Sequence, residues 1–452
     1  MKPDRLLDLF CELARIESPS RREALMAKRC KAELEGLGFT VRFDDSAERT
    51  GSDTGNLIAF RAGSVPGAVA LCGHMDTVRP CKGIEPVVEG GVIRSAGDTI
   101  LSADDKAGVA AIFEGVRSLI EAGEALPDVY VVLTTCEEMH LLGAGALDAS
   151  FLSEGTPCYV LDADGDPGTI INQAPCHCTF TATFRGKSAH AGVEPERGVS
   201  ALAMAAQAVC HMPLGRISAH TTSNVGVIEC DGATNVVPGT CWLSGECRST
   251  SLERARAERS AMDEAMRAAA AQAGGSVDIE WRTDYLPISY ASDHPLVEGV
   301  MRAARAAGLR PRLAASGGGA DANILAGRGI SAITLATGMA NYHSCDEYIT
   351  VDDLNGCARL VEQLVLEARI AALPRRERFR RRGRAQGDAV GVRETSISRP
   401  LQGFGFCLLR LAEPTRPLIR NFCNNFSRNC VQNVHHRSLK RCMTCQNTVK
   451  YG

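Results

Sequence analysis

Apolar residues recur along most of this chain in two alternating patterns, one typical of amphipathic helices and the other of buried strands. Helices are predicted at residues 6–13 and 25–37, and again from Gly108 to about Ala122. Short apolar runs at residues 40–43, 57–60, 69–72 and 129–134 predict strands between these helices. Strands that alternate with long helices indicate an α/β fold, in which a mostly parallel sheet is flanked by helices.

The pattern changes between residues 178 and 287. Residues 179–184 alternate polar and apolar side chains, as a half-exposed strand does, and further strands are predicted at 225–230, 241–247 and 277–281. Helices are predicted at 199–211 and 251–273, and the earlier pattern then returns with a helix at 296–307 and a buried strand at 330–335. The sequence therefore predicts one large α/β domain made of residues 1–177 and 288–374, interrupted by an inserted α+β domain of residues 178–287.

Charge separates the last part of the chain from the rest. Residues 375–452 carry 17 Lys and Arg against 4 Asp and Glu, whereas residues 1–374 carry 33 against 49, so the net charges are +13 and −16. No sustained apolar periodicity returns in the basic segment. We expect residues 375–452 to be a disordered or non-native extension. The alternative is a nucleic-acid-binding arm, for which this basic segment is the only support.

Neither a signal peptide nor a membrane span is predicted. Charged residues interrupt the first positions of the chain, and no later run approaches the roughly 18 apolar residues of a membrane span. The 19 cysteines are scattered through apolar segments without the dense spacing of a disulfide framework, so most are expected to be reduced and buried. We therefore expect a cytoplasmic protein.

Five stretches place histidine or carboxylate side chains where a predicted strand ends. Because ligands of open α/β sheets bind at strand ends, these stretches are expected to converge on one site. Two histidines and several carboxylates, without a cysteine, suit a dinuclear site for zinc, cobalt or manganese. The candidate residues are His74 with Asp76, Asp104, the pair Glu137 and Glu138, Asp162, and His343.

The adjacent glutamates follow directly after a predicted buried strand. On an exposed helix such a pair is an ordinary solvated feature, but in an enclosed site two like charges both stay ionised only if a cation compensates them. If Glu138 binds a metal ion, Glu137 is free to act as a general base.

This set resembles one family, the dinuclear zinc exopeptidases that include peptidase T, carboxypeptidase G and aminoacylase, and it is most similar to the peptidase T-like branch. The resemblance covers roughly residues 1–373. It rests on the combination of His74-Met75-Asp76-Thr77-Val78, Ala103-Asp104-Asp105-Lys106-x-Gly108 and Glu137-Glu138.

The resemblance implies two zinc ions per subunit, with cobalt or manganese as alternatives. His74, Asp104 and Asp162 would hold one ion, and Asp104, Glu138 and His343 the other, with Asp104 as the bridge. Glu137 would be the general base, and Asp76 would orient His74.

The resemblance also extends to the inserted segment, which is similar to the family's lid and dimerisation domain and implies a homodimer. His190 lies in a stretch whose histidine reaches a substrate carbonyl, often in the partner subunit's active site. Asn235 and Arg248 resemble substrate-contacting residues, and an arginine is a natural partner for a peptide's terminal carboxylate. A plain polar loop at His190 and a surface ion pair at Arg248 stay open as alternatives.

Three positions differ from the family pattern or compete with it. His140 stands where the family often has a turn containing Val or Gly, and we interpret it as a bystander. Asp164 competes with Asp162 for the ligand role, and Asp162 is preferred because it directly follows a predicted strand. The glycine-rich stretch 316–323 lacks the Lys-Ser/Thr of a phosphate-binding loop and is interpreted as an active-site loop close to substrate.

The sequence thus predicts a metal-dependent hydrolase of amide bonds in short peptides, and an aminotripeptidase fits the resemblance best. A carboxypeptidase or an N-acyl-amino-acid deacylase on the same scaffold is the alternative, because selectivity depends on lid geometry and a few kcal/mol of pocket contacts. A non-catalytic binding protein would lack the base or a ligand, and here all of them are present.

Overall fold

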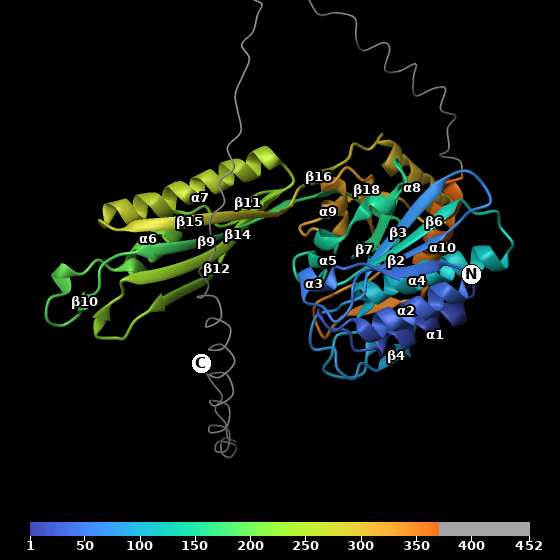
Figure 1. Cartoon of the computed structure of the whole chain (residues 1–452), viewed down its shortest axis with the longest axis horizontal. Helices are drawn as coiled ribbons and strands as arrows, with labels where there is room; N and C mark the ends of the chain where they lie inside the picture. The colour runs from blue at the N-terminus through green and yellow to red at the C-terminus, as the bar shows by residue number, and fades with distance from the viewer. Residues whose placement is uncertain (370–452) are drawn as a thin grey trace, which may run out of the picture. The chain divides into compact units, whose positions relative to one another are not determined.

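The computed structural model describes residues 1–369, so the basic segment at 375–452 lies outside the described residues. The described part contains a large sheet built from both its beginning and its end, and a separate sheet built from its middle (Figure 1). Within residues 1–369, no helix is both long and apolar enough to cross a membrane.

The large sheet has nine strands, and its parallel centre positions the site. Its main path runs β1-β2-β6-β3-β7-β18-β8-β16, and β17 pairs with β8. The central strands β6, β3, β7 and β18 are parallel, whereas antiparallel pairs lie toward both edges. The predicted α/β class with a mostly parallel central sheet is confirmed. The strands are β1 (Thr40–Phe43), β2 (Leu57–Arg61), β3 (Ala68–His74), β6 (Asp128–Thr134), β7 (Cys158–Ala163), β8 (Thr169–Ala174), β16 (Ile288–Ser289), β17 (Arg312–Ala315) and β18 (Ala332–Ala336).

Helices bury both faces of this sheet, which explains why its central strands are continuous apolar runs. In β3, Val69 and Leu71 join the core on one face, while Ala70 and Cys72 join a second core on the other. The first face is covered by α1 (Pro3–Ala14), α2 (Ala24–Gly36), α4 (Ala103–Glu121), α8 (Pro295–Ala306) and α10 (Val351–Glu367), and α10 from the end of the described chain packs directly on α4. The second face carries α9 (Asp321–Gly327).

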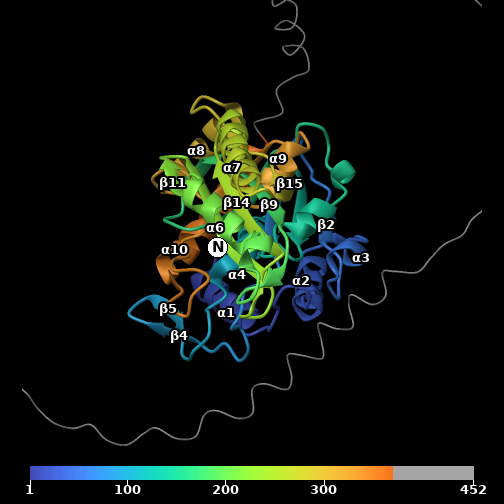
Figure 2. The ribbon, with the colours of Figure 1, turned by 90° about the vertical axis from the view of Figure 1, so that its left-hand side faces the viewer.

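The middle of the chain forms a five-stranded antiparallel sheet in the order β11-β12-β14-β9-β15. Two helices, α6 (Ala201–His211) and α7 (Leu252–Gln272), lie side by side on one face of it (Figures 1 and 2). Phe180 and Phe184 of the sheet pack there against Met262 and Met266 of α7. We call this sheet with its helices the lid. Its strands are β9 (Cys176–Arg185), β11 (Gly215–Ser218), β12 (Thr221–Asp231), β14 (Thr240–Ser249) and β15 (Ser276–Tyr285).

The chain enters and leaves the lid through neighbouring strands. β9 follows β8 of the large sheet, and β15 precedes β16 of the same sheet. β9 and β15 pair along their length, from Arg185 opposite Ser276 to His177 opposite Tyr285. The two crossings between the sheets are therefore adjacent.

Smaller elements, among them two 3₁₀ helices at Ala149–Phe151 and Pro195–Arg197, complete the described chain. A three-stranded sheet contains β4 (Pro86–Glu89), β5 (Val92–Ser95) and β19 (Tyr348–Thr350), and β10 (Ala189–His190) pairs with β13 (Val236–Val237) in the lid segment. Two short helices, α3 (Ala47–Thr50) and α5 (Leu142–Ala146), contact each other beside the large sheet.

Candidate active site

Four of the five predicted metal ligands lie at or after the end of one of the parallel central strands, whereas Asp104, which was also predicted at a strand end, lies at the start of α4 instead. His74 is the last residue of β3, Glu137 and Glu138 come shortly after β6, and Asp162 lies at the end of β7. His343 belongs to the loop between β18 and β19, and Asp104 is the second residue of α4. Since parallel strands all end at the same edge of a sheet, this topology gathers side chains that are far apart in the sequence.

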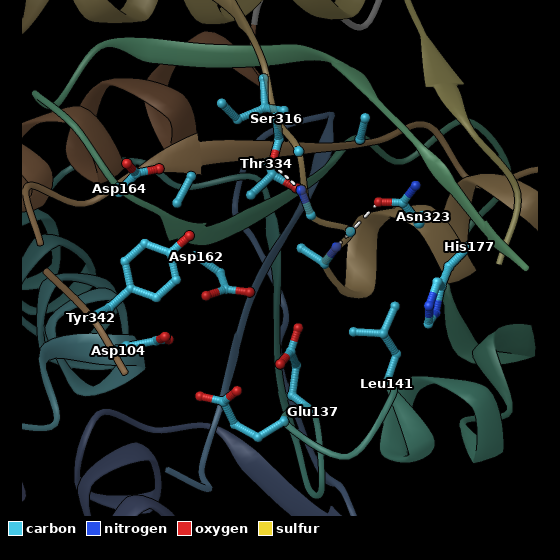
Figure 3. Close-up of a pocket in the computed structure, with 18 of the residues that line it drawn as sticks. Asp104, Glu137, Leu141, Asp162, Asp164, His177, Ser316, Asn323, Thr334 and Tyr342 are labelled. Carbon is cyan, nitrogen blue, oxygen red and sulfur yellow. Dashed lines mark hydrogen bonds between the residues drawn. The ribbon is translucent and has the colours of Figure 1, made fainter. Parts of the chain in front are cut away.

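Asp104 lies between the two histidines. Its Oδ1 is 3.0 Å from His74 Nε2, and its Oδ2 is 3.1 Å from His343 Nε2. On the first side, Asp162 Oδ1 is 3.5 Å from His74 Nε2, and on the second, Glu138 Oε2 is 2.9 Å from His343 Nε2. Figure 3 shows the carboxylates of Asp104, Glu137 and Asp162 directed toward the same space. The structure thus brings all five predicted metal ligands together around Asp104.

The chemistry of these donors fits divalent metal ions. Burial and the nearby carboxylate of Asp104 raise the pKa of Asp162 to about 7, and they also raise the pKa of Glu138. Carboxylates crowded away from water favour a bound cation, and imidazole with carboxylate suits zinc, cobalt or manganese. Two sets of side chains bring ligand atoms within 4.8 Å of one another: His74, Asp104 and Glu138, and His74, Asp105 and Asp162. Asp105, which was not among the predicted ligands, also accepts a hydrogen bond from the His74 N–H at 3.1 Å.

Asp76 connects two of the strand ends. Its backbone carbonyl lies 3.0 Å from His74 Nδ1, and its carboxylate lies 3.5 Å from the same nitrogen. The carboxylate accepts hydrogen bonds from the N–H groups of Glu137 at 2.9 Å and Glu138 at 3.3 Å, and from the Ser20 hydroxyl at 2.7 Å. Asp76 therefore orients His74 mainly through its backbone, while its side chain fixes the turn that carries both glutamates.

A cavity of about 500 Å³ opens over the cluster. Asp104, Glu137 and Asp162 line one part of it, and the glycine-rich stretch contributes residues 316–320. In Figure 3, His177 lies across this cavity from Asp104. Of the competing residues, Asp164 lines the cavity but is exposed, and His140 lines it with its ring stacked on that of His177 at 5.8 Å.

Arg248 also lines the cavity, where β14 of the lid approaches it. It pairs across the lid sheet with His177, and both side chains bind Glu246: Arg248 Nε at 2.9 Å and His177 Nε2 at 2.7 Å. A hydrogen bond from His177 lowers the pKa of Glu246 to about 2, despite partial burial. Arg248 is thus a partly buried cation at the lid side of the cavity.

His190 and Asn235 lie elsewhere in the lid and do not line this cavity. His190 belongs to β10 and pairs with Val236 of β13, and the Asn235 carbonyl accepts a hydrogen bond from the Ala191 N–H at 2.9 Å. Both residues are exposed. They are close to each other but separate from the ligand cluster within this chain.

Tyr342 lines the cavity without having been predicted to do so, and the same is true of two aromatic residues at the boundary of the lid, His177 and Tyr285. They are opposite each other where β9 and β15 join the lid to the large sheet, with ring centroids 5.5 Å apart. Their only signal in the sequence is their position at the change of pattern near residues 178 and 287, which marks a boundary between domains without indicating a role.

Two-metal clusters of this composition are found in hydrolases, including aminopeptidases and phosphatases. This chain belongs to one such group, peptidase family M20/M25/M40, whose profile matches residues 70–367. The family resemblance predicted from the motifs is confirmed.

Similar proteins place the chain near peptidase T within this family. It is 40% identical over 365 residues to the uncharacterised protein YqjE of Bacillus subtilis (strain 168), covering 80% of this chain and 98% of YqjE. The aminopeptidase PepT from Bacillus cereus ATCC 10987 is 39% identical, with a TM-score of 0.76 over 81% of this chain and 99% of PepT. A tripeptidase from Staphylococcus aureus subsp. aureus Mu50 is 32% identical, with a TM-score of 0.78 over 82% of this chain and 99% of the tripeptidase. The protein is a peptidase of the peptidase T-like branch.

Proposed function

We propose that this protein is an aminotripeptidase, which removes the amino-terminal residue from free tripeptides with the help of two divalent metal ions. The observation that carries the proposal is the cavity itself, which has a cluster of carboxylates at one side and Arg248 at the lid side. Its volume of about 500 Å³ falls within the range of small-molecule sites, roughly 300–1,000 Å³. The names of the similar aminopeptidase and tripeptidase support the same substrate class.

In this proposal, His74, Asp104 and Asp162 hold one ion, and Asp104, Glu138 and His343 hold the other. We propose zinc as the metal, with cobalt or manganese as alternatives. When bound, such ions polarise the scissile carbonyl and lower the pKa of the attacking water.

Glu137 is proposed as the general base. Its carboxylate projects into the cavity beside Asp162, while its backbone N–H is held by Asp76. Glu137 takes the proton of the attacking water and passes it to the leaving amine, so that one carboxylate serves both halves of the reaction.

The two sides of the cavity, one lined by carboxylates and the other by Arg248, suit the two oppositely charged ends of a tripeptide. Arg248 donates to the terminal carboxylate, for which a guanidinium offers paired, parallel donors. Its existing ion pair with Glu246 fixes the guanidinium before substrate arrives. The positively charged amino end of the peptide is then directed toward the carboxylate side.

We also propose that the protein acts as a homodimer in the cytoplasm. His190 and Asn235 are exposed and lie away from the cavity of their own chain, as residues that complete a partner's active site would. There, His190 would stabilise the negative charge that develops on the substrate carbonyl. The cysteines among the described residues are all free thiols, which fits a reducing compartment. Sedimentation equilibrium tests the dimer, and a monomeric active enzyme would reject it.

Product analysis by mass spectrometry tests the function. Zinc-loaded protein and its Glu137→Gln variant receive a free tripeptide, the same tripeptide with an acetylated amino terminus, and an N-acetyl amino acid. We expect loss of the first residue from the free tripeptide only, and no cleavage by Glu137→Gln. Cleavage of the acetylated tripeptide at its last bond would instead indicate a carboxypeptidase, and release of acetate would indicate a deacylase.

A further inference from the structure

Glu347 is a buried carboxylate in the loop that carries His343, and none of the roles described so far uses it. Only 1% of the residue is exposed. Its Oε2 accepts hydrogen bonds from the N–H groups of Leu101 at 2.8 Å and Ser102 at 2.7 Å, and its Oε1 accepts one from the Asp104 N–H at 2.9 Å. All three donors belong to the segment from which Asp104 projects.

The backbone of that segment cannot satisfy its own N–H groups. Ser102 has a φ of +67°, and Asp104 has a non-helical ψ of 104° at the start of α4. The first N–H groups of a helix have no acceptor within the helix, and leaving them unpaired in a buried place is costly. Hydrogen bonds to a carboxylate are stronger than those to a neutral acceptor. Glu347 therefore determines where this irregular backbone, and with it Asp104, is held.

The loop that supplies Glu347 is closed on itself. Ala340 and Tyr348 pair across its base, with N···O distances of 2.9 and 3.0 Å, and the Ser344 hydroxyl donates to the Asn341 carbonyl at 2.6 Å. His343 lies inside this loop with a φ of +60°, a conformation that a non-glycine residue keeps only when its surroundings impose it. His343 and Glu347 are thus carried by one tied unit of backbone.

We propose that Glu347 is a positioning residue for the metal site shared by Asp104 and His343. It joins the His343 loop to the Asp104 segment, so that the two side chains approach each other at the observed 3.1 Å between His343 Nε2 and Asp104 Oδ2. The inference rests on the proposed function, because it takes these two residues as ligands of one ion. It predicts that loss of the carboxylate weakens this ion more than the other one. Asp104 serves both ions, but His343 serves only this one, and His74 and Asp162, the remaining ligands of the other ion, lie on β3 and β7.

Metal retention in the full-length, metal-loaded protein tests the inference. Glu347→Gln replaces one acceptor oxygen by an NH₂ group, which faces the backbone N–H donors. The matched control is Glu114→Gln. Glu114 is another fully buried carboxylate, and it accepts a hydrogen bond from the backbone N–H of Lys2 at 2.8 Å. It lies in α4 but does not contact the backbone around Asp104 or the loop that carries His343. Each protein is challenged with increasing chelator, and the ions retained are counted by mass spectrometry. Tripeptide kcat and KM are measured in parallel.

We expect Glu347→Gln to release one of its two ions at a chelator concentration about 10- to 100-fold lower than the concentration that wild type requires. Altering a residue that supports a metal ligand usually lowers metal affinity by this factor. We expect kcat to fall with little change in KM, and added metal to restore it. Glu114→Gln should retain both ions as wild type does. Thermal unfolding checks that each variant is folded, and Glu347→Asp, which keeps the charge on a shorter side chain, provides the same comparison if Glu347→Gln does not fold.

Release of both ions at wild-type chelator concentrations by Glu347→Gln would overturn the inference, and so would an equal loss in Glu114→Gln. The two proposals fail separately. A wild-type protein that holds two ions without cleaving tripeptides would reject the substrate class, while the comparison of retained ions would still decide the role of Glu347.

Discussion

Replacing Gly108 by alanine tests how closely α4 must approach the central sheet for the site to form. Gly108 lies in α4, and a Cβ built on it would be 2.2 Å from the carbonyl oxygen of Leu161 in β7 and 2.3 Å from Asp105 Oδ1. The Leu161 atom belongs to backbone, so the clash is relieved only if helix and strand move apart. Leu161 directly precedes Asp162, and Gly108 lies one turn after Asp104.

Two effects of opposite sign decide the stability of Gly108→Ala. Alanine in a helix interior is favoured over glycine by about 1 kcal/mol. Overpacking a tight core costs about 1–3 kcal/mol, and a Cβ at 2.2 Å from a carbonyl oxygen lies well inside any real contact. We therefore take the overpacking cost at its upper end, about 3 kcal/mol, which leaves a net destabilisation of about 2 kcal/mol. We also expect kcat to fall, because Asp104 and Asp162 are displaced from each other.

Thermal unfolding and tripeptide turnover check this, with Gly36→Ala as the control. Gly36 ends α2 and has open space where a Cβ would stand, so its replacement should leave activity unchanged and stability unchanged or slightly raised. A loss of about 2 kcal/mol corresponds to a fall in melting temperature of roughly 4–8 °C. A Gly108→Ala variant that melts at or above the wild-type temperature with full activity would refute the close approach of α4 to β7.

Three further predictions follow from other parts of the molecule. Arg5→Ala should destabilise the protein by about 1.5–3 kcal/mol in urea unfolding, because buried Glu114 loses the guanidinium bonded at 2.7 and 2.8 Å; an unchanged urea midpoint would contradict this. The pKa of Glu246 falls to about 2 on folding, below its ordinary 4.5, so its stabilising contribution is present above pH 4.5 and is lost as the pH falls toward 2. The difference in melting temperature between wild type and Glu246→Gln should therefore shrink over that interval, and a constant difference would count against the interaction with His177. Chelation should abolish activity and lower the melting temperature, and added zinc, cobalt or manganese should restore both. Ions that bind only the folded state stabilise it, by about 4 kcal/mol when the free metal concentration is 1,000 times Kd. A melting temperature indifferent to chelator would reject a bound metal in the folded site.

The central sheet was predictable because its strands are buried on both faces. Residues 69–72 and 129–133 are apolar without interruption, and they form the middle of β3 and most of β6. The sheet of β4, β5 and β19 was missed, because its strands have only three or four residues and are partly exposed, so they show no clear alternation. Helices and strands could therefore be predicted wherever burial produced a sufficiently long pattern of apolar residues.

The ligand cluster was predictable for a different reason, since four of its five members lie at or after the ends of apolar strands of the large sheet and the topology brings those strand ends together. Asp104 is the exception, because it lies at the start of α4. The supporting contacts were not readable. Glu347 is an ordinary acid in a polar loop until the fold brings it to the backbone of Leu101, Ser102 and Asp104. The family resemblance implied that Arg248 contacts substrate and that His190 often serves a partner's active site, but only the fold shows that Arg248 lines the cavity of its own chain and that His190 does not.

The adjacency of β9 and β15 affects how the large domain can fold. Closing an unstructured loop over residues 178–284 would cost about 4 kcal/mol through the logarithmic length term alone, before β16, β17 and β18 could reach their places beside β7 and β8. In the folded lid, His177 and Tyr285 are cross-strand partners, so their Cα atoms are about 5 Å apart. A lid that folds first therefore presents its two ends as if they were joined by a tight turn, and the large sheet can assemble as though the inserted domain were a short connection.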